Sequence, residues 1–440
     1  MKPHKSSNIS TRLYPIVIFI FILLAGMFLH TIPAFAQQSR EMLLYSYIMR
    51  VRELIKSSYY KPVSDEVLVR GAIDRMRKVL PSIKTPSKYD WRILENYYLG
   101  YSQKHPSLAG KLGEAAIDGM VDSLRDPYSV LLTPSKRKIL EGGDGSGIGL
   151  ELGYKKGKVV VIAPIVGSPA KKTGLKSGDR IVAINGRSVR KKSLYETSML
   201  ISGKRGQKIS ISVIRNGRKH TFHPRFAPLE IDPIKYSLLS KNIGYIRIGL
   251  FSGKILREFQ YALNVMKKKK VRGLIIDLRN NPGGDFMEAL RIAARFVPDG
   301  VLVWVIKKAG RPMPKKSVSG EKFNAPVVVL INEGSASASE VLAAALSENN
   351  RAVLMGRKTF GKGVVQTVYN LTGGARLCLT TEKYLTPKKR NIQDVGLMPK
   401  IVIKSAGQNV DPTKDGFVIK AWKYLDERIL FRKKKYYQKL

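Results

Sequence analysis

Residues 326–346 place a serine-rich turn between an apolar run and a helical pattern. Pro326 to Ile331 is rich in β-branched side chains, which predicts a buried strand. Apolar residues from Val341 to Leu346 follow with helical spacing. The serines between them therefore lie at a helix start, where unpaired N–H groups and the helix dipole stabilise a nucleophilic oxygen and an oxyanion. One alternative stays open, because residues 337–340 also fit a capping box in which the hydroxyl only satisfies an amide.

A lysine between two glycines follows in the run Thr359-Phe-Gly-Lys-Gly363. The glycines let the backbone enter a tight site, and desolvation lowers the pKa of a lysine so that its neutral amine can accept a proton from a hydroxyl. A serine with a lysine base is one variant of the Ser-His-Asp arrangement. Gly-Lys-Gly is also common in surface turns, so this pattern alone leaves a solvated turn as the alternative.

Three runs together resemble one family, the carboxyl-terminal processing peptidases, or tail-specific serine proteases. They are Asp277-Leu-Arg-Asn-Asn-Pro-Gly-Gly284, Ser335-Ala-Ser-Ala-Ser-Glu340 and Thr359-Phe-Gly-Lys-Gly-Val-Val-Gln366, in the order that the family has them. The resemblance implies an α/β fold, with a crotonase-like β/α superhelix as the protease core. It further implies a nucleophile, Ser337; a general base, Lys362; a residue that orients the lysine, Gln366; and two oxyanion-hole amides, Gly283 and Ala338.

The first 36 residues read as a signal peptide. Basic residues without an acid precede the apolar stretch Ile16 to Leu29, and Ala34-Phe-Ala36 is a cleavage signature. We therefore expect an exported, periplasmic or extracytoplasmic protein that starts near Gln37. A retained segment, which would leave the protein membrane-associated, is the alternative.

Residues 37–135 predict a helical region. Apolar residues of 41–56 share one helical stripe, and Ser64 predicts the N-cap of a second helix that runs to about Val79. The stripe fits a helix packed on its own chain or a dimerisation helix, and the resemblance favours the homodimer. Residues 81–106 are polar with interspersed aromatics, and 111–124 is helical again. Residues 71–76 and 115–120 are loosely alike, so about 72–114 is interpreted as an insertion or partial repeat.

Residues 141–228 resemble a PDZ domain. The glycine-rich loop 147–150, Gly178-Asp-Arg-Ile181 running into Ala183-Ile-Asn-Gly186, and an Asn216-Gly217 hairpin signal carry this resemblance. A β-domain with ordinary glycine turns is the alternative. A PDZ domain adds a peptide to a sheet edge as a strand, and its loop amides bind the terminal carboxylate. The predicted peptide-binding residues are Gly147, Ile148, Gly149 and Leu150.

Residues 229–405 alternate strand-like and helical runs, which predicts an α/β peptidase core with a partly parallel sheet. Residues 406–440 predict a closing helix and a basic tail. Two positions depart from the family pattern: Lys388 stands where the family usually has Gly, and Lys400 where it usually has Asp.

The chain has 78 basic and 33 acidic residues, a net charge of +45. The positive runs are separate and lack interleaved aromatics, so we expect no nucleic-acid partner, although electrostatic association with an anionic membrane or cell wall fits the charge. Cys378 is the only cysteine, which excludes an intrachain disulfide. No histidine lies in a zinc motif, and the Ser/Lys chemistry requires neither metal nor organic cofactor.

Two functions follow from these patterns. In the first, the protein is an exported serine endopeptidase that recognises apolar protein C-termini through its PDZ domain and cleaves peptide bonds through an acyl-enzyme. In the second, it is a non-catalytic PDZ adaptor or scaffold that binds C-terminal peptides. The presence of Ser337, Lys362 and Gln366 favours the first, because a scaffold has no need of all three.

Overall fold

The computed structural model describes Met42 and residues 45–140, 146–190, 192–229, 232–253, 255–308, 310–318, 322–405, 407 and 409–437. The predicted signal peptide, 1–36, lies outside the described residues. The chain divides into two compact units. One comprises residues up to Lys56 together with Val63–Arg125, and the other comprises Ser57–Pro62 and Asp126–Leu440.

The first unit is helical. A helix over 45–58 is followed by α2 (Asp65–Val79), α3 (Trp91–Lys104) and α4 (Ala109–Ser123). The predicted cap at Ser64 is confirmed, because its side chain accepts the N–H of Val67 at 3.4 Å. The polar, aromatic-bearing stretch 81–106, for which no helix was predicted, contains α3, whose buried face of Leu94, Tyr98 and Ser102 is spaced by four residues.

The two similar segments of this unit pack against each other. Gly71 of α2 lies so close to Gly119 of α4 that a methyl group on Gly71 would meet the Gly119 carbonyl oxygen at 2.3 Å. In both helices the apolar residues that the two segments have in common are buried, among them Ile73 of α2 and Ile117 of α4. The segment interpreted as an insertion therefore completes the helical unit rather than forming a separate loop.

The peptidase core is built on a six-stranded sheet of order β10-β11-β12-β15-β16-β19. Only the edge pair β10–β11 is antiparallel, so the predicted partly parallel sheet is confirmed. The strands are β10 (Ile234–Leu239), β11 (Ile243–Ile248), β12 (Gly273–Asp277), β15 (Val327–Ile331), β16 (Ala352–Gly356) and β19 (Ile401–Val402).

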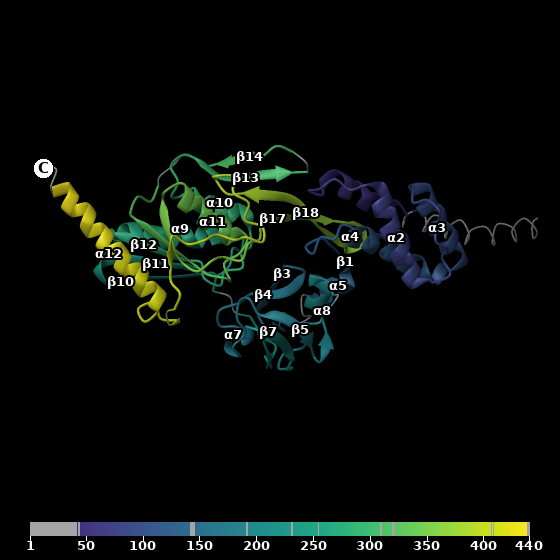
Figure 1. The fold of residues 1–440 in the computed structure, drawn as a ribbon, viewed down its shortest axis with the longest axis horizontal. Helices are drawn as coiled ribbons and strands as arrows, with labels where there is room; N and C mark the ends of the chain where they lie inside the picture. The colour runs from purple at the N-terminus through teal and green to yellow at the C-terminus, as the bar shows by residue number, and fades with distance from the viewer. Residues whose placement is uncertain are drawn as a thin grey trace, which may run out of the picture. The chain divides into compact units, whose positions relative to one another are not determined.

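Helices cover both faces of this sheet (Figure 1). Ile276 and Val329 point into a cluster shared with α9 (Ile255–Lys268), α10 (Phe286–Ala293) and α11 (Ala338–Glu348). Ile275 and Val328, one residue earlier, face the cluster shared with α12 (Gly416–Tyr437). Because successive strand side chains point to opposite faces, both faces of the central strands are apolar, which explains their continuous β-branched runs.

A second sheet is antiparallel and centred on the long strand β18 (Arg376–Leu385), which pairs with β1 (Val130–Leu132), β17 (Val364–Asn370) and β13 (Val301–Lys307). β14 (Met313–Lys316) extends it beyond β13. The Val301 run was expected to alternate with the core helices, yet it belongs to this sheet. Sequence periodicity predicts a strand but not the sheet that the strand joins.

The PDZ region forms a β-sheet of order β3-β4-β5-β7-β8, with β6 (Arg187–Ser188) paired to β5 and a separate pair β2–β9. The predicted Asn216-Gly217 hairpin is confirmed between β7 (Ile211–Arg215) and β8 (Arg218–Phe222), and both turn residues have positive φ. Its remaining elements are β2 (Ser146–Gly147), β3 (Leu150–Lys155), β4 (Lys158–Pro164), α7 (Pro169–Lys172), β5 (Arg180–Ile184), α8 (Leu194–Met199) and β9 (Ala227–Pro228).

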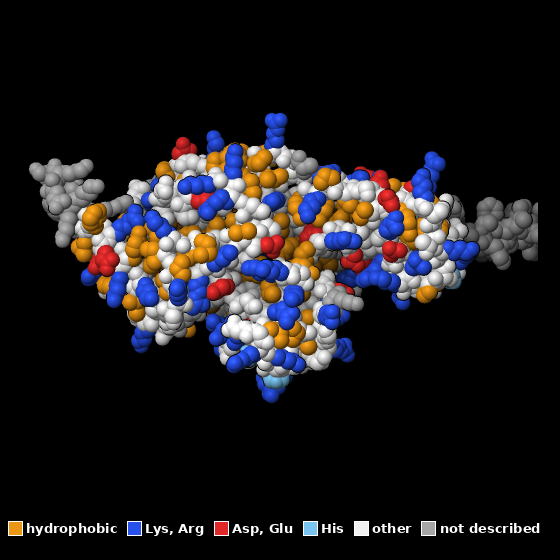
Figure 2. Space-filling model, viewed as in Figure 1, with side chains coloured by type: hydrophobic (Ala, Val, Ile, Leu, Met, Phe, Trp, Pro, Cys, Tyr) orange, Lys and Arg blue, Asp and Glu red, His pale blue; other side chains and the backbone are white. Residues whose placement is uncertain are grey.

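Lysine and arginine side chains are scattered over the visible face rather than gathered in one patch (Figure 2). This distribution agrees with the separate basic runs in the sequence. Within the described ranges, no helix combines the length and the apolarity that a membrane crossing requires.

Candidate active site

Ser337 lies where the loop after β15 enters α11. Its backbone has φ 53° and ψ −119°, an unusual conformation for a residue with a side chain. Such a conformation costs about 1–3 kcal/mol and persists only where the surroundings fix it. Ser335 holds the loop, because its Oγ donates to the carbonyl of Leu278 at 2.8 Å and accepts the N–H of Asn332 at 3.0 Å.

Glu340 joins the serine loop to the lysine loop. Its fully buried carboxylate accepts the backbone N–H groups of Ser337 at 3.0 Å, Gly361 at 2.8 Å and Lys362 at 2.9 Å, together with the hydroxyl of Thr359. Burial raises the pKa of this carboxyl group to about 7, against the lowering effect of these four donors. The glutamate half of a capping box is therefore formed at 337–340, since Glu340 accepts the Ser337 N–H, and the same glutamate also anchors the Gly-Lys-Gly turn.

Tyr384 makes a second link between the two loops. Its hydroxyl, carried by β18, lies in hydrogen-bond contact with the carbonyl oxygens of Ser337, at 3.2 Å, and of Lys362. The side chain is almost fully buried. Ser337 and Lys362, 25 positions apart in the sequence, are thus held together through their N–H groups by Glu340 and through their carbonyls by Tyr384.

The side chain of Lys362 is enclosed rather than solvated. Its ammonium lies 4.7 Å from the centre of the Tyr128 ring. Burial lowers the pKa of Lys362, while the negative charges of Glu151, Asp126 and Glu340 act in the opposite direction. A surface turn would leave the lysine in water with an ordinary pKa, so the environment fits the base better than the turn.

Within the described part of the chain, Gln366 forms no hydrogen bond with Lys362. It lies on β17, and the hydrogen bond that its amide nitrogen donates goes to Thr380 Oγ1 at 3.3 Å. A strand irregularity separates Val365 from Gln366, which shifts the register of this side chain relative to the lysine turn. Its expected role in orienting Lys362 therefore requires a change from this arrangement.

Gly283 lies directly against the serine. It has φ 109°, and a methyl group there would meet Ser337 Cβ at 2.8 Å and Ala338 N at 3.1 Å. Its own N–H donates to Asn281 Oδ1 at 2.9 Å, so that amide is occupied. Ala338 is the first residue of α11, and N–H groups at this position lack an acceptor within the helix. Both predicted oxyanion donors thus border Ser337, one of them already paired.

The PDZ loop is held at the edge of its sheet. Ser168 Oγ donates to the Gly149 carbonyl at 3.0 Å, and the N–H of Ala170 donates to the Ile148 carbonyl at 2.8 Å. Gly147 ends β2, and Leu150 begins β3, the edge strand of the sheet, which is where a peptide strand would add.

PDZ strands also contact the lysine loop. Lys155 Nζ donates to the carbonyl of Phe360 at 2.8 Å. The Phe360 ring lies in one buried cluster with Val160 and Ile162 of β4 and with Ala336 beside the serine. The strand that would receive a peptide is therefore coupled to residues on both sides of the candidate dyad.

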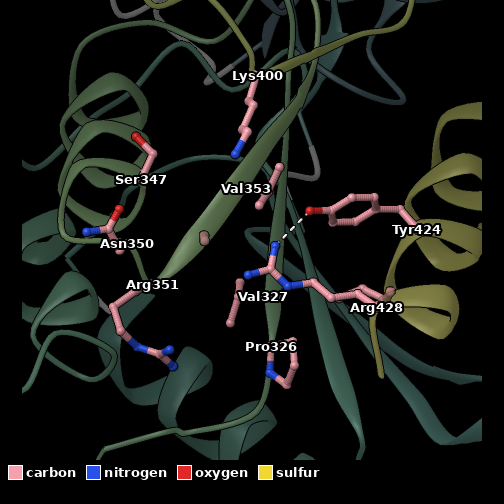
Figure 3. A pocket seen from close by; sticks show the side chains of 11 residues that line it. Pro326, Val327, Ser347, Asn350, Arg351, Val353, Lys400, Tyr424 and Arg428 are labelled. Carbon is pink, nitrogen blue, oxygen red and sulfur yellow. Dashed lines mark hydrogen bonds between the residues drawn. The ribbon is translucent and has the colours of Figure 1, made fainter. Parts of the chain in front are cut away.

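The two family departures, Lys388 and Lys400, line a cavity of about 350 Å³ on the core, away from Ser337. Lys400 also lines a cavity of about 170 Å³ between the start of β16 and α12. Figure 3 shows the Lys400 amine turned into this second cavity opposite Arg428, which donates to the Tyr424 hydroxyl at 2.7 Å. Neither cavity involves the candidate dyad.

Three contributors were not expected from the sequence: Tyr128, Tyr384 and the anchoring role of Glu340. Glu340 had a signal in the sequence, since it occupies the capping-box position, but three of its four donors come from the distant loop 359–362. Among the described residues, no group of three or more His, Cys, Asp and Glu side chains is arranged to hold a metal ion.

Comparison with known proteins places this geometry in a family. A model described as Peptidase family S41 matches residues 242–403, and one described as PDZ domain matches 146–223, which decides against an ordinary β-domain. The carboxyl-terminal-processing protease of Synechocystis is 32% identical over 332 residues, 73% of this chain and 77% of that protein. CtpB, the carboxy-terminal processing protease of Bacillus subtilis, is 38% identical over 304 residues, 67% of this chain and 63% of that protein.

A solved structure agrees with these sequence relatives. The photosystem II D1 C-terminal processing protease matches with a TM-score of 0.67 at 29% identity, covering 82% of this chain and 93% of that one. The motifs at 277–284, 335–340 and 359–366 all fall inside the matched peptidase region. The chain therefore belongs to the carboxyl-terminal processing proteases of peptidase family S41, serine peptidases, and carries a PDZ domain.

Proposed function

We propose that this protein is an exported endopeptidase that cleaves peptide bonds with a Ser337/Lys362 dyad. The observation that carries the proposal is the shared anchoring of the two residues: their N–H groups bind the same oxygen of Glu340, at 3.0 and 2.9 Å, and their carbonyls bind one hydroxyl of Tyr384. A nucleophile and its base need such fixed relative positions.

In the proposed reaction, the neutral amine of Lys362 accepts the proton of the Ser337 hydroxyl as its oxygen attacks the substrate carbonyl. The N–H groups of Gly283 and Ala338 then stabilise the oxyanion. Lys362 returns the proton to the leaving amine, and water hydrolyses the resulting acyl-enzyme. Two contacts must change first: the Lys362 ammonium must leave the Tyr128 ring, and the Gly283 N–H must leave Asn281.

The PDZ domain supplies the proposed substrate selection. β3 is an edge strand beside the 147–150 loop, so an apolar protein C-terminus can add there as a strand. The contacts of Lys155 and Phe360 allow this domain to influence the lysine loop as well as recruit substrate. The order of parallel strands with helices between them supports a crotonase-like superhelix.

The proposed export rests on the signal peptide predicted for residues 1–36. Amino-terminal sequencing of the secreted protein tests this, because removal of the signal peptide would leave a mature chain that starts near Gln37. The homodimer through the amino-terminal helices rests on the apolar stripe of 41–56. Association with an anionic membrane or cell wall rests on the net charge of +45.

Cleavage of an unfolded protein with an apolar C-terminus tests the dyad. We expect Ser337→Ala and Lys362→Ala to stop cleavage while the protein stays folded, because the anchors of both residues to Glu340 and Tyr384 are backbone groups that the substitutions keep. The matched controls are Ser347→Ala on the same helix and Lys358→Ala on the neighbouring exposed turn, which should cleave normally. Cleavage by folded Ser337→Ala, with peptide binding retained, would favour the adaptor.

A further inference from the structure

A cavity of about 660 Å³ lies between the turn after β4 and the peptidase core; none of residues 147–150 lines it, although the N–H of its wall residue Ile165 donates to the Gly149 carbonyl at 2.8 Å. Its walls include Lys171 of α7 and Ile165 from the PDZ side, and Arg247 of β11, Gly249 and Asn280 from the core side. This size falls in the range of about 300–1,000 Å³ that small-molecule sites occupy. The cavity is therefore large enough for a ligand that touches both sides.

Two partly buried cations face this cavity without a carboxylate partner. Lys171 and Arg247 form no ion pair with any described acidic residue, and Arg247 donates one hydrogen bond, to the Arg279 carbonyl at 3.2 Å. Burial lowers the pKa of Lys171, and the positive charges of Arg247, Lys176 and Arg279 lower it further. Like charges thus converge here at a cost to the folded protein.

The acids that border the cavity are already engaged. Asp415 accepts from Arg279 at 2.9 and 3.2 Å and from backbone N–H groups through both of its oxygens. Asp232 is exposed and lies 3.4 Å from Lys235, a third cation at the cavity. Asp277, whose pKa the charge of Arg247 helps to lower, is itself paired with Arg279 at 2.6 Å. The lining holds four cations, Lys171, Lys235, Arg247 and Arg279, against two acids, Asp232 and Asp415, so the cavity keeps an excess of positive charge.

We propose that this cavity is a binding site for an oxyanion, a carboxylate or phosphate group carried by a small molecule or by an acidic peptide side chain. Lys171 would bind it from the PDZ side and Arg247 from the core side, because a charged donor on each side makes a strong hydrogen bond to an oxyanion. Ile165 and Val410 provide apolar surface for the rest of the ligand.

The position of the site gives it a consequence for the active-site loop. Asn280 Oδ1 accepts from Ser177 Oγ of the PDZ domain at 3.3 Å and from Asn332 Nδ2 at 3.0 Å. Asn280 stands three residues before Gly283 in the loop that borders Ser337. An anion held between Lys171 and Arg247 would therefore stabilise the contact of the PDZ domain with this loop.

Isothermal titration with inorganic pyrophosphate, at constant ionic strength, tests the site without requiring protease activity. We expect saturable binding to the full-length protein and binding at least about tenfold weaker in Lys171→Met/Arg247→Met, since two charge-assisted hydrogen bonds are lost. The matched control is Lys172→Met, the exposed neighbour on α7, which should bind like the wild type. No saturable binding, or equal weakening in both variants, would overturn the proposal.

A second measurement uses the wild-type chain, so it does not depend on how the double variant folds. Pyrophosphate should slow acetylation of Lys171 by an amine-reactive ester and leave Lys172 unchanged, and equal rates at Lys171 with and without pyrophosphate would contradict the site. A glutamate-rich peptide that displaces pyrophosphate would assign the oxyanion to peptide carboxylates. A peptide that leaves pyrophosphate bound would assign it to phosphate-bearing molecules.

Discussion

Replacing Glu340 by glutamine changes one carboxylate oxygen into an amino group at the junction of the serine loop and the lysine loop. The carboxylate faces three backbone N–H groups, at 2.8 to 3.0 Å, and one hydroxyl. A protonated glutamate can still satisfy all three N–H groups, because its O–H can donate to Thr359 Oγ1 while the same oxygen accepts from Gly361. The amino group of glutamine cannot accept, so at least one N–H is left without a partner.

An unsatisfied buried N–H costs about 1–3 kcal/mol, which is the loss of unfolding free energy that we expect for Glu340→Gln near pH 5. Cleavage should fall about a hundredfold, because the orphaned Gly361 N–H moves the lysine turn relative to Ser337 and a displacement of about 1 Å is worth that factor. The fold should survive, since the exchanged side chains have nearly the same volume.

The loss of unfolding free energy caused by Glu340→Gln should also depend on pH. Burial raises the pKa of the Glu340 carboxyl group to about 7 in the folded protein from its ordinary value of 4.5, so between these values the folded state binds more protons than the unfolded state. The wild type therefore loses up to about 3 kcal/mol as the pH rises from 4.5 to 7, whereas the glutamine variant has no such loss. The difference between the two proteins should shrink above pH 7.

Denaturant unfolding at about pH 5 and pH 8, with cleavage measured on the same preparations, checks both effects. Glu333→Gln is the matched control, because this glutamate lies in the same loop but is 46% exposed and 3.5 Å from Arg357, a surface pair worth about 0–1 kcal/mol. A penalty that grows with pH would refute the reasoning, since it would mean that the donors stabilise the carboxylate more than burial destabilises it.

Three further predictions concern single contacts. Gly283→Ala should lose most activity and about 1–3 kcal/mol of stability, because its methyl group would meet Ser337 Cβ at 2.8 Å, whereas Gly157→Ala, also at positive φ but with nothing within 4 Å, should lose stability only. Tyr128→Leu should move the acid limb of the pH–activity profile to lower pH by roughly 0.4–1.5 units, since a cation–π contact worth about 0.5–2 kcal/mol no longer favours the ammonium form of Lys362, and Tyr128→Phe should leave the limb in place. Gly71→Ala should lower the melting temperature, because the added methyl group would clash with Gly119. The control Gly100→Ala, whose methyl group would meet nothing within 4 Å, should leave the melting temperature unchanged or raise it. Equal melting temperatures for the two variants would count against the close packing of α2 and α4.

Much of the peptidase core was predictable because its signals are local. The largely apolar runs at 273–278 and 327–331 are buried on both faces, and such a run is the sequence pattern that predicts a buried strand. The caps and the Asn216-Gly217 hairpin depend on neighbours a few residues away. The α3 helix was missed because its aromatic and aliphatic residues are spread over several faces, while only Leu94, Tyr98 and Ser102 are buried.

The candidate site was predictable in its members but not in its contacts. Motif order brings Ser337 and Lys362 into one hypothesis, yet Tyr384 reaches both from a strand of the other sheet, a pairing that no local pattern encodes. The direction in which a side chain points is likewise not predictable from the local sequence. Lys362 lies against Tyr128, and Gln366 donates a hydrogen bond to Thr380. The contacts that these side chains make depend on long-range packing, which sequence periodicity does not describe.

The lone thiol of the chain reports on the strand that carries Tyr384. Cys378 is buried at the register where β18 pairs with Val130 of β1 on one side and Val368 of β17 on the other. Burial limits access to this thiol and raises its pKa, so we expect a thiol reagent to modify it faster when these strands separate. The labelling rate of unmodified protein thus measures how often the sheet behind the candidate dyad opens, and a bound substrate that tightens the site should slow it.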